Sequence, residues 1–246
     1  MPAEGQAVPK PVPVLLSLLA GYVDSCTFLA LFGLFVAQVT GSFVLAGTQL
    51  VAHESGGEVK LLAIPAFFVA CIVTTVLVKA VGQGTRAALA APLALETALL
   101  LGLLVSLLAG APLAGPDTPA AVCAALSGLC AMGVQGALVR LAIRGTSSTN
   151  VMTTNTVQLA IDAAELVMAW RAHRGAPADI PAANAYAGAK HRASQLWPIL
   201  LGFLAGTITG ALAYARFGPW CILAAIALAG GLALWASRRA AAAASA

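Results

Sequence analysis

The sequence predicts an all-α integral membrane protein with about six transmembrane helices. Of its 246 residues, 60% are hydrophobic and only 9% are charged, and the mean hydropathy is +0.92. Soluble proteins average roughly 25% charged residues, so the chain lies far outside the soluble class. Apolar runs of about twenty residues, long enough to cross a bilayer as a helix, recur along the whole chain. A transmembrane β-barrel would instead alternate apolar and polar residues over strands of about ten residues.

The apolar runs divide the chain into two membrane-embedded halves. We expect an N-terminal tail at 1–11, a first half at 12–110, a Pro- and Gly-rich linker at 111–118, a second half at 119–237 with a polar loop at 171–192, and a C-terminal tail at 238–246. The expected spanning helices cover about 12–34, 61–81, 87–110, 119–143, a stretch from Pro198 onward, and 219–236. Shorter segments at 41–53 and 150–170 follow the interrupted helices, and the sequence leaves open whether they cross the membrane.

Each half begins with a helix that a polar stretch interrupts. In the first half, Asp24 lies inside an apolar run that Thr40-Gly41-Ser42 then splits. In the second half, 133–136 corresponds to 21–24, and 151–157 corresponds to 38–44, with offsets that differ by a single residue. A proline-led helix follows in both halves. The chain is therefore interpreted as two repeats of equivalent design, each with a broken helix or a short re-entrant segment.

The basic residues predict how the repeats are oriented. If the short segments do not cross, each repeat crosses three times, and 11 of the 13 Lys and Arg residues share the face of the termini, opposite Lys60 and Arg216. If they do cross, the division is eight to five. The positive-inside rule favours three crossings, with both termini cytoplasmic. Three-span repeats are inverted relative to each other, as in many secondary transporters, whose site lies at the repeat interface.

Two carboxylates, Asp24 and Glu96, lie well inside apolar helices. A carboxylate at the bilayer centre costs at least about 2.5 kcal/mol, so it usually faces the protein interior or a wet cavity. Asp24 is interpreted either as a proton carrier or cation ligand, or as a structural carboxylate that caps the broken helix or pairs with a base. Glu96 is the second candidate for proton coupling, with structural pairing as its alternative.

The polar breaks are candidate binding elements for a solute or ion. Thr40 and Ser42 in the first half, and Thr153 and Asn155 in the second, can offer side-chain oxygens beside the free N–H groups of a helix start. Ordinary N-capping is the alternative, because Ser, Thr and Asn are good caps. Recurrence of the break in both halves favours a binding role in addition to capping.

Three glycines predict close packing of one membrane helix. Gly202, Gly206 and Gly210 form a G-x-x-x-G-x-x-x-G run in an apolar stretch. Small residues at this spacing let two helices approach closely. The contact could lie within one chain or between the copies of a homo-oligomer.

Other classes of function lack their sequence motifs. The chain has no phosphate-binding loop, no nucleophile elbow and no H-E-x-x-H pair, so we do not expect an enzyme. Five cysteines without a C-x-x-C pair and three scattered histidines predict neither a metal site nor a cofactor. The net charge of +4 comes from bases at the ends of apolar runs, which indicates membrane orientation and not nucleic-acid binding. The expected partners are therefore the lipid bilayer and an unknown small solute or ion.

Two signatures resemble those of a known family. The first comprises residues 20–24, 28–29, 35–36 and 39–42, and the second comprises 132–135 and 151–153. Together they look like the paired signatures of the YoaK family, the bacterial membrane proteins of DUF1275. The resemblance implies a small protein of the bacterial inner membrane with about six spans and no assigned substrate. This chain has Ser42 and Gly136 where the family tends to have Asn, and Thr154 where it tends to have Gly.

The leading hypothesis is a permease or channel of the bacterial inner membrane. Its site would form where the two broken helices meet, from Asp24, Thr40, Ser42, Gln135, Thr153 and Asn155. The alternative is a non-transporting scaffold or regulatory protein, whose buried polar groups would satisfy one another. A water-accessible cavity ending at Asp24 would favour transport, whereas a dry interior in which neighbours hydrogen-bond Asp24 would favour the scaffold.

Overall fold

The computed structural model describes residues 8–52, 57–82, 87–143, 149, 152–175 and 180–244, and every element in these ranges is a helix. This result confirms the predicted all-α class. In chain order the helices are α1 (Pro11–Ala30), α2 (Val39–Ala52), α3 (Gly57–Val81), α4 (Ala87–Ala109), α5 (Pro119–Ala142), α6 (Met152–Gly175), α7 (Ile180–Phe217), the 3-10 turn η1 (Gly218–Cys221) and α8 (Ile222–Ala244).

Several helices are long and apolar enough to cross a membrane, so the chain is a multi-pass membrane protein. Among the described residues, five stretches meet this condition: Pro11–Ala30, Leu61–Val81, Ala87–Ala109, Pro119–Ala142 and Ala183–Ala240. The last stretch continues from α7 through η1 into α8. Neither α2 nor α6 is among the five.

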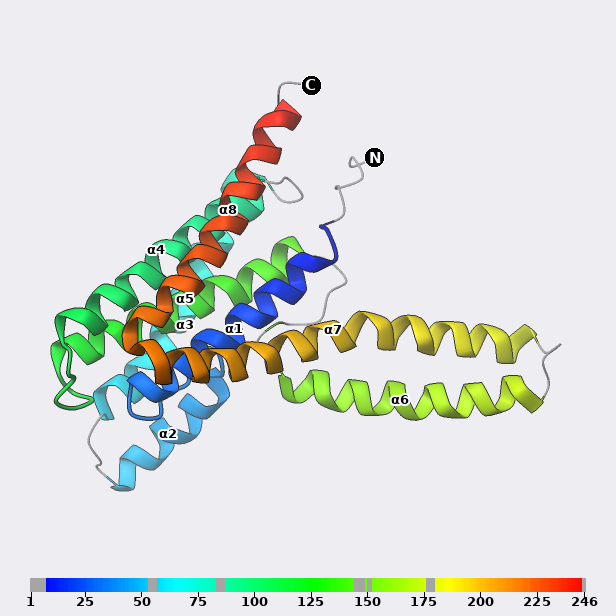
Figure 1. Ribbon diagram of the computed structural model, residues 1–246, viewed down its shortest axis with the longest axis horizontal. Coiled ribbons are helices and arrows are strands. Elements are labelled where there is room, and N and C mark those ends of the chain that lie inside the picture. The colour runs from blue at the N-terminus through cyan, green and yellow to red at the C-terminus, as the bar shows by residue number, and fades with distance from the viewer. Residues whose placement is uncertain are drawn as a thin grey trace.

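The main contacts between the membrane helices join the first half of the chain to the second. α1 lies along α7, α5 contacts both α3 and α4, and α4 packs against α8 (Figure 1). The main hydrophobic core sits between these helices, and its fully buried members include Leu19, Leu100, Leu129 and Met132. Because each pair joins the first half of the chain to the second, the two halves interlock and do not fold as separate bodies.

A helical hairpin projects from this bundle. It consists of α6 and the N-terminal part of α7, which lie side by side (Figure 1). Arg192 on α7 ties the two helices together, because its Nε lies 3.2 Å from Asp162 Oδ1 and its Nη2 contacts Glu165 on α6. The ionic contacts and the polar composition of α6 suit a segment outside the hydrocarbon region.

The three glycines of the G-x-x-x-G-x-x-x-G run lie where α7 meets α1. A Cβ atom at Gly202 would come within 2.8 Å of the Val14 carbonyl oxygen, and one at Gly206 would overlap the carbonyl oxygen of Leu18. On the other side of the contact, a Cβ at Gly21 of α1 would overlap the carbonyl oxygen of Phe203. The two backbones therefore touch directly, and this contact is within one chain.

The first helix ends earlier than the sequence predicted. We expected the first helix to continue to residue 34 and to break at Thr40-Gly41-Ser42. Instead α1 ends at Ala30, and positive φ angles at Phe32 (55°) and Gly33 (86°) turn the chain. Thr40-Gly41-Ser42 belongs to the first turns of α2, and Thr153–Asn155 belongs to the first turn of α6. The hydroxyl-rich motifs therefore start helices and do not interrupt them.

Two expected non-helical segments are helical where the structure describes them. The expected polar loop, 171–192, comprises the end of α6 and the beginning of α7, and its residues 176–179 lie outside the described residues. The expected C-terminal tail, 238–246, continues α8 to Ala244. Both segments are rich in alanine, which has the highest helix propensity of all residues, and this preference outweighs their polarity.

The glycine contact between α1 and α7 gives a stability prediction. We expect Gly206→Ala to destabilise the protein by about 1–3 kcal/mol, because the added methyl group must push the two backbones apart. The matched control is Gly231→Ala on α8, where a Cβ would meet nothing within 4 Å. Titration of the purified protein in mixed micelles with a denaturing detergent measures both variants, and equal midpoints would contradict the direct backbone contact.

Candidate functional site

Asp24 holds the segment that joins α1 to α2. Its Oδ1 accepts hydrogen bonds from the backbone N–H groups of Val36 and Ala37, both at 2.8 Å, and its Oδ2 accepts one from Gln38 Nε2 at 3.1 Å. The side chain is only 2% exposed. These N–H groups precede α2 and have no carbonyl of a preceding turn to bond, so the carboxylate supplies the missing acceptor.

Gln135 makes a similar connection in the second half. It is fully buried in α5, and its Nε2 donates to the carbonyl oxygen of Leu16 at 2.9 Å and to Thr149 Oγ1 at 3.2 Å. Thr149 lies shortly before α6. In each half, therefore, a buried polar side chain on the first helix fixes the segment that leads into the next helix.

A cavity of about 1060 Å³ lies between the start of α2 in the first half and the start of α6 in the second half. It is at the upper end of the range of small-molecule pockets, roughly 300–1,000 Å³. Residues from both halves line it: Ala37, Gln38, Val39, Thr40, Phe67, Cys71, Thr75, Gly136, Ala137, Arg140, Leu141, Met152, Thr153, Thr154, Asn155 and Gln158.

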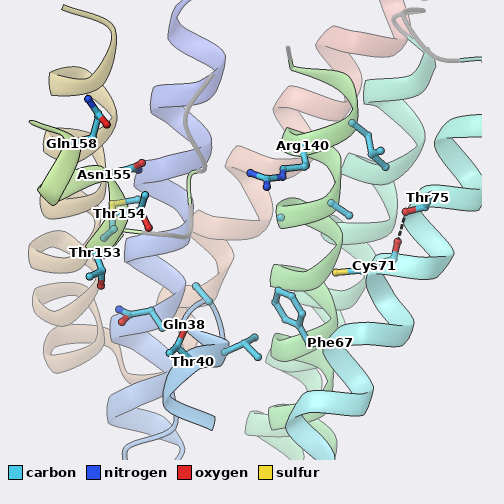
Figure 2. A pocket seen from close by; sticks show the side chains of 16 residues that line it. Gln38, Thr40, Phe67, Cys71, Thr75, Arg140, Thr153, Thr154, Asn155 and Gln158 are labelled. Carbon is cyan, nitrogen blue, oxygen red and sulfur yellow. Dashed lines mark hydrogen bonds between the residues drawn. The ribbon is translucent and has the colours of Figure 1, made fainter. Parts of the chain in front are cut away.

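The cavity has a polar side and an apolar side. Figure 2 shows Thr153, Thr154 and Asn155 of α6 facing Phe67 and Cys71 of α3 across the space. Gln38 and Thr40 lie at the end near α2 (Figure 2). The arrangement offers hydroxyl and amide groups on one side and a hydrocarbon surface on the other.

Among the described residues that line the cavity, Arg140 is the only charged one. Its side chain extends from α5 into the space between the walls (Figure 2). It is exposed and makes no ion pair or hydrogen bond with any residue in the described ranges. The described part of the lining therefore contributes one guanidinium group and no carboxylate.

A second, smaller cavity of about 240 Å³ reaches Asp24. Its other lining residues are mostly apolar: Ser25, Phe28, Leu29, Phe35, Gln38, Thr207 and Ala211. Gln38 lines both cavities, and its amide is bonded to Asp24. The Gln38 side chain therefore forms part of the wall between the two spaces.

The structure brings together three of the six predicted binding residues. Thr40, Thr153 and Asn155 line the large cavity, and Asp24 lines the small one. The remaining two, Ser42 and Gln135, are buried and line neither.

The sequence reasoning missed the charged member of the lining. It treated Arg140 as one of the bases that set membrane orientation, because it lies in the last turn of an apolar helix. A signal was nevertheless present: Arg140 falls four residues after Gly136, so the two share a helix face, and the glycine leaves room beside it.

Glu96 lies apart from both cavities. It is fully buried in α4, between turns that carry the buried Leu93 and Leu100. Neither of its carboxylate oxygens has a hydrogen-bond partner among the described residues. An ionised carboxylate without any partner would cost several kcal/mol in such a place.

The described residues contain no group of three His, Cys, Asp or Glu side chains that could hold a metal ion. In comparisons with known proteins, the family described as a protein of unknown function, DUF1275, matches residues 12–235. No curated protein and no solved structure matches the chain. The match covers both interrupted helices and the whole cavity lining.

The hydrogen bonds of Asp24 predict that its replacement lowers the stability of the protein. We expect Asp24→Ala to lower stability by about 3–5 kcal/mol, because it leaves two buried N–H groups without an acceptor. Asp24→Asn keeps one acceptor oxygen, so it should cost about 1–2 kcal/mol. The adjacent Ser25→Ala is the control, and detergent-induced unfolding is the measurement. Equal stability of Asp24→Ala and wild type would contradict the capping role.

Because Glu96 has no hydrogen-bond partner among the described residues, we expect its replacement to raise the stability of the protein. Glu96→Met should stabilise the protein by about 1–3 kcal/mol, because an unpartnered polar group is replaced by an apolar side chain of similar size. Leu100→Met is the matched swap one turn away and should cost less than about 1.5 kcal/mol. A loss of stability in Glu96→Met, measured in the same titration, would mean that the carboxyl group has a partner.

Proposed function

This chain belongs to the DUF1275 family of proteins of unknown function, and from its geometry we propose that it is a bacterial inner-membrane permease or channel for a small solute or ion. The observation that carries the proposal is the cavity of about 1060 Å³ lined by the starts of two helices, α2 and α6. Thr40 belongs to the first of them, and Thr153 and Asn155 belong to the second. In a membrane protein, a polar cavity at helix breaks is typical of a substrate site.

Equivalent contacts in the two halves support an arrangement of inverted repeats. A Cβ at Gly21 of α1 would overlap the carbonyl oxygen of Phe203 in α7, and one at Gly133 of α5 would come within 2.9 Å of the carbonyl oxygen of Phe67 in α3. Gly133 corresponds to Gly21 in the sequence. The first helix of each half therefore packs, through a glycine, on the proline-led helix of the other half.

The helix lengths support three crossings in each half. The stretch Ala183–Ala240 is long enough for two crossings and bends at η1. Together with the four other apolar helices, it gives six crossings if α2 and α6 do not cross. The ionic contacts of Arg192 with α6 favour a position outside the hydrocarbon region. Both termini then lie on the cytoplasmic face, which carries most of the Lys and Arg residues.

Proton coupling is a weaker part of the proposal. Asp24 reaches only the small cavity, and three donors already hold its carboxylate, so its contacts favour the capping role. Glu96 has no protein partner in the described residues and lines neither cavity. Transport through the large cavity does not require either group.

One observation favours the alternative, a scaffold or regulatory protein. The hairpin of α6 and α7 projects from the bundle and exposes large apolar side chains, including Val167, Met168 and Trp170 on α6. Such a hairpin could serve as a contact for a partner protein. The cavity would then be a by-product of the helix breaks and would not exchange with water.

Water accessibility distinguishes the two functions. In a chain without its five native cysteines, we expect Thr40→Cys and Thr153→Cys to react with a membrane-impermeant maleimide, because both positions line a solvated cavity. Leu212→Cys on α7 is the control. Its leucine is 67% exposed and belongs to an apolar helix that would face lipid. The reagent is added to intact cells and to inverted vesicles. If neither Thr40→Cys nor Thr153→Cys is labelled from either side, the scaffold function is favoured.

A further inference from the structure

We propose that the large cavity binds an organic anion, with Arg140 as the group that recognises its carboxylate or phosphate. The inference rests on the proposed function, because it names the class of solute for the same cavity. Three observations carry it: the charge of the lining, the hydroxyl groups on α6, and the apolar part of the lining.

The charge of the lining selects an anion. Arg140 has no acidic partner among the described residues, although its guanidinium lies in a partly enclosed space. Two buried carboxylates already have partners: Asp24 accepts from Gln38 and two backbone N–H groups, and Asp162 accepts from Gln158 and Arg192. A cation would therefore meet an unbalanced positive charge in the cavity, whereas an anion would neutralise it.

The helix dipole accounts for a base at this position of α5, but it does not account for where the Arg140 side chain points. A base in the last turn of α5 interacts favourably with the helix dipole, and this holds for any orientation of its side chain. It does not explain why the guanidinium extends into a cavity (Figure 2). A planar guanidinium binds a carboxylate or phosphate through two parallel hydrogen bonds, a geometry that lysine cannot offer.

The opposite wall supplies further donors. The hydroxyl groups of Thr153 and Thr154 line the cavity and make no hydrogen bond within the described residues. Both are exposed to the cavity space. These hydroxyls are donors that an organic anion in the cavity can use in addition to Arg140.

The size and apolar side of the cavity indicate that the anion carries an organic body. The volume of about 1060 Å³ is far larger than an inorganic ion needs. Phe67, Leu141 and Met152 form part of the lining and offer no hydrogen bond. A ligand with a charged end at Arg140 and an uncharged body against these residues would satisfy both sides of the cavity.

Cys71 provides a native reporter for the test. It is a free cysteine that lines the cavity, so a chain in which only the other four cysteines are replaced carries one thiol at the site. The full-length protein is reconstituted in phosphatidylcholine vesicles. Its reaction rates are measured with an anionic, sulfonate-bearing methanethiosulfonate and with a cationic, trimethylammonium-bearing one, each divided by the rate with a free thiol.

We expect the normalised anion-to-cation rate ratio to fall by about fivefold or more in Arg140→Gln, because the variant removes the one charge that the described residues place in the cavity lining. Arg216→Gln makes the same change outside the cavity and should leave the ratio unchanged. Benzoate should slow the labelling of Cys71 while benzamide, its neutral counterpart of the same shape, should not. Arg140→Lys should keep most of the rate ratio and lose most of the protection by benzoate.

The outcomes separate the anion assignment from the transport proposal. If Cys71 reacts but Arg140→Gln leaves the ratio unchanged, or if benzamide protects as well as benzoate, the anion assignment is wrong and the solvated cavity stands. If neither Cys71 nor a Thr153→Cys reporter reacts with any reagent, the proposed function fails as well. If added phosphatidylglycerol protects Cys71 and benzoate does not, the assignment to an anion holds and a lipid headgroup is its source.

Discussion

The fold depends on satisfying backbone N–H groups where a membrane helix is broken. Water is scarce at this depth, so each group needs a partner from the protein. Asp24 provides one carboxylate oxygen for the N–H groups of both Val36 and Ala37. This arrangement allows α2 to start close beside α1, and the side chain of Gln38 completes it. Before α6 the buried Gln135 plays a related part, because its side-chain N–H donates to the Thr149 hydroxyl and so holds the approach to that helix. The starts of α2 and α6, which both line the large cavity, are thus held by buried polar side chains.

The sequence was informative about the fold because the strongest signals are local. Apolar runs and proline positions located α4 and α5 to within a residue, and the glycine run marked the contact between α7 and α1. The end of the first helix was placed too late, because Asp24 satisfies backbone groups twelve and thirteen residues further along the chain. A long-range bond of this kind leaves no periodic pattern. The alanine-rich insert was likewise expected to be a loop, although its helix propensity is high.

The candidate site could be predicted only in part, for a physical reason. Helix starts rich in Thr and Asn can be recognised in the sequence, and Thr40, Thr153 and Asn155 do line the cavity. Arg140, Phe67 and Cys71 come from helices whose relative rotation the sequence does not specify. Whether a side chain faces a cavity or lipid depends on that rotation. The role of Asp24 also depended on tertiary structure, since its three donors were invisible before the fold was known.

The long helix α7 has a mechanical consequence. Its 38 residues extend about 57 Å at 1.5 Å per residue, from the tip of the projecting hairpin to the bundle, with Pro198 between the two parts. α6 packs mainly on α7 and carries one entire wall of the large cavity. The hairpin and the bundle are therefore joined by one continuous helix, in which the Pro198 ring removes one backbone hydrogen bond. A tilt of the hairpin would move α6 relative to α5 and so change the width of the cavity.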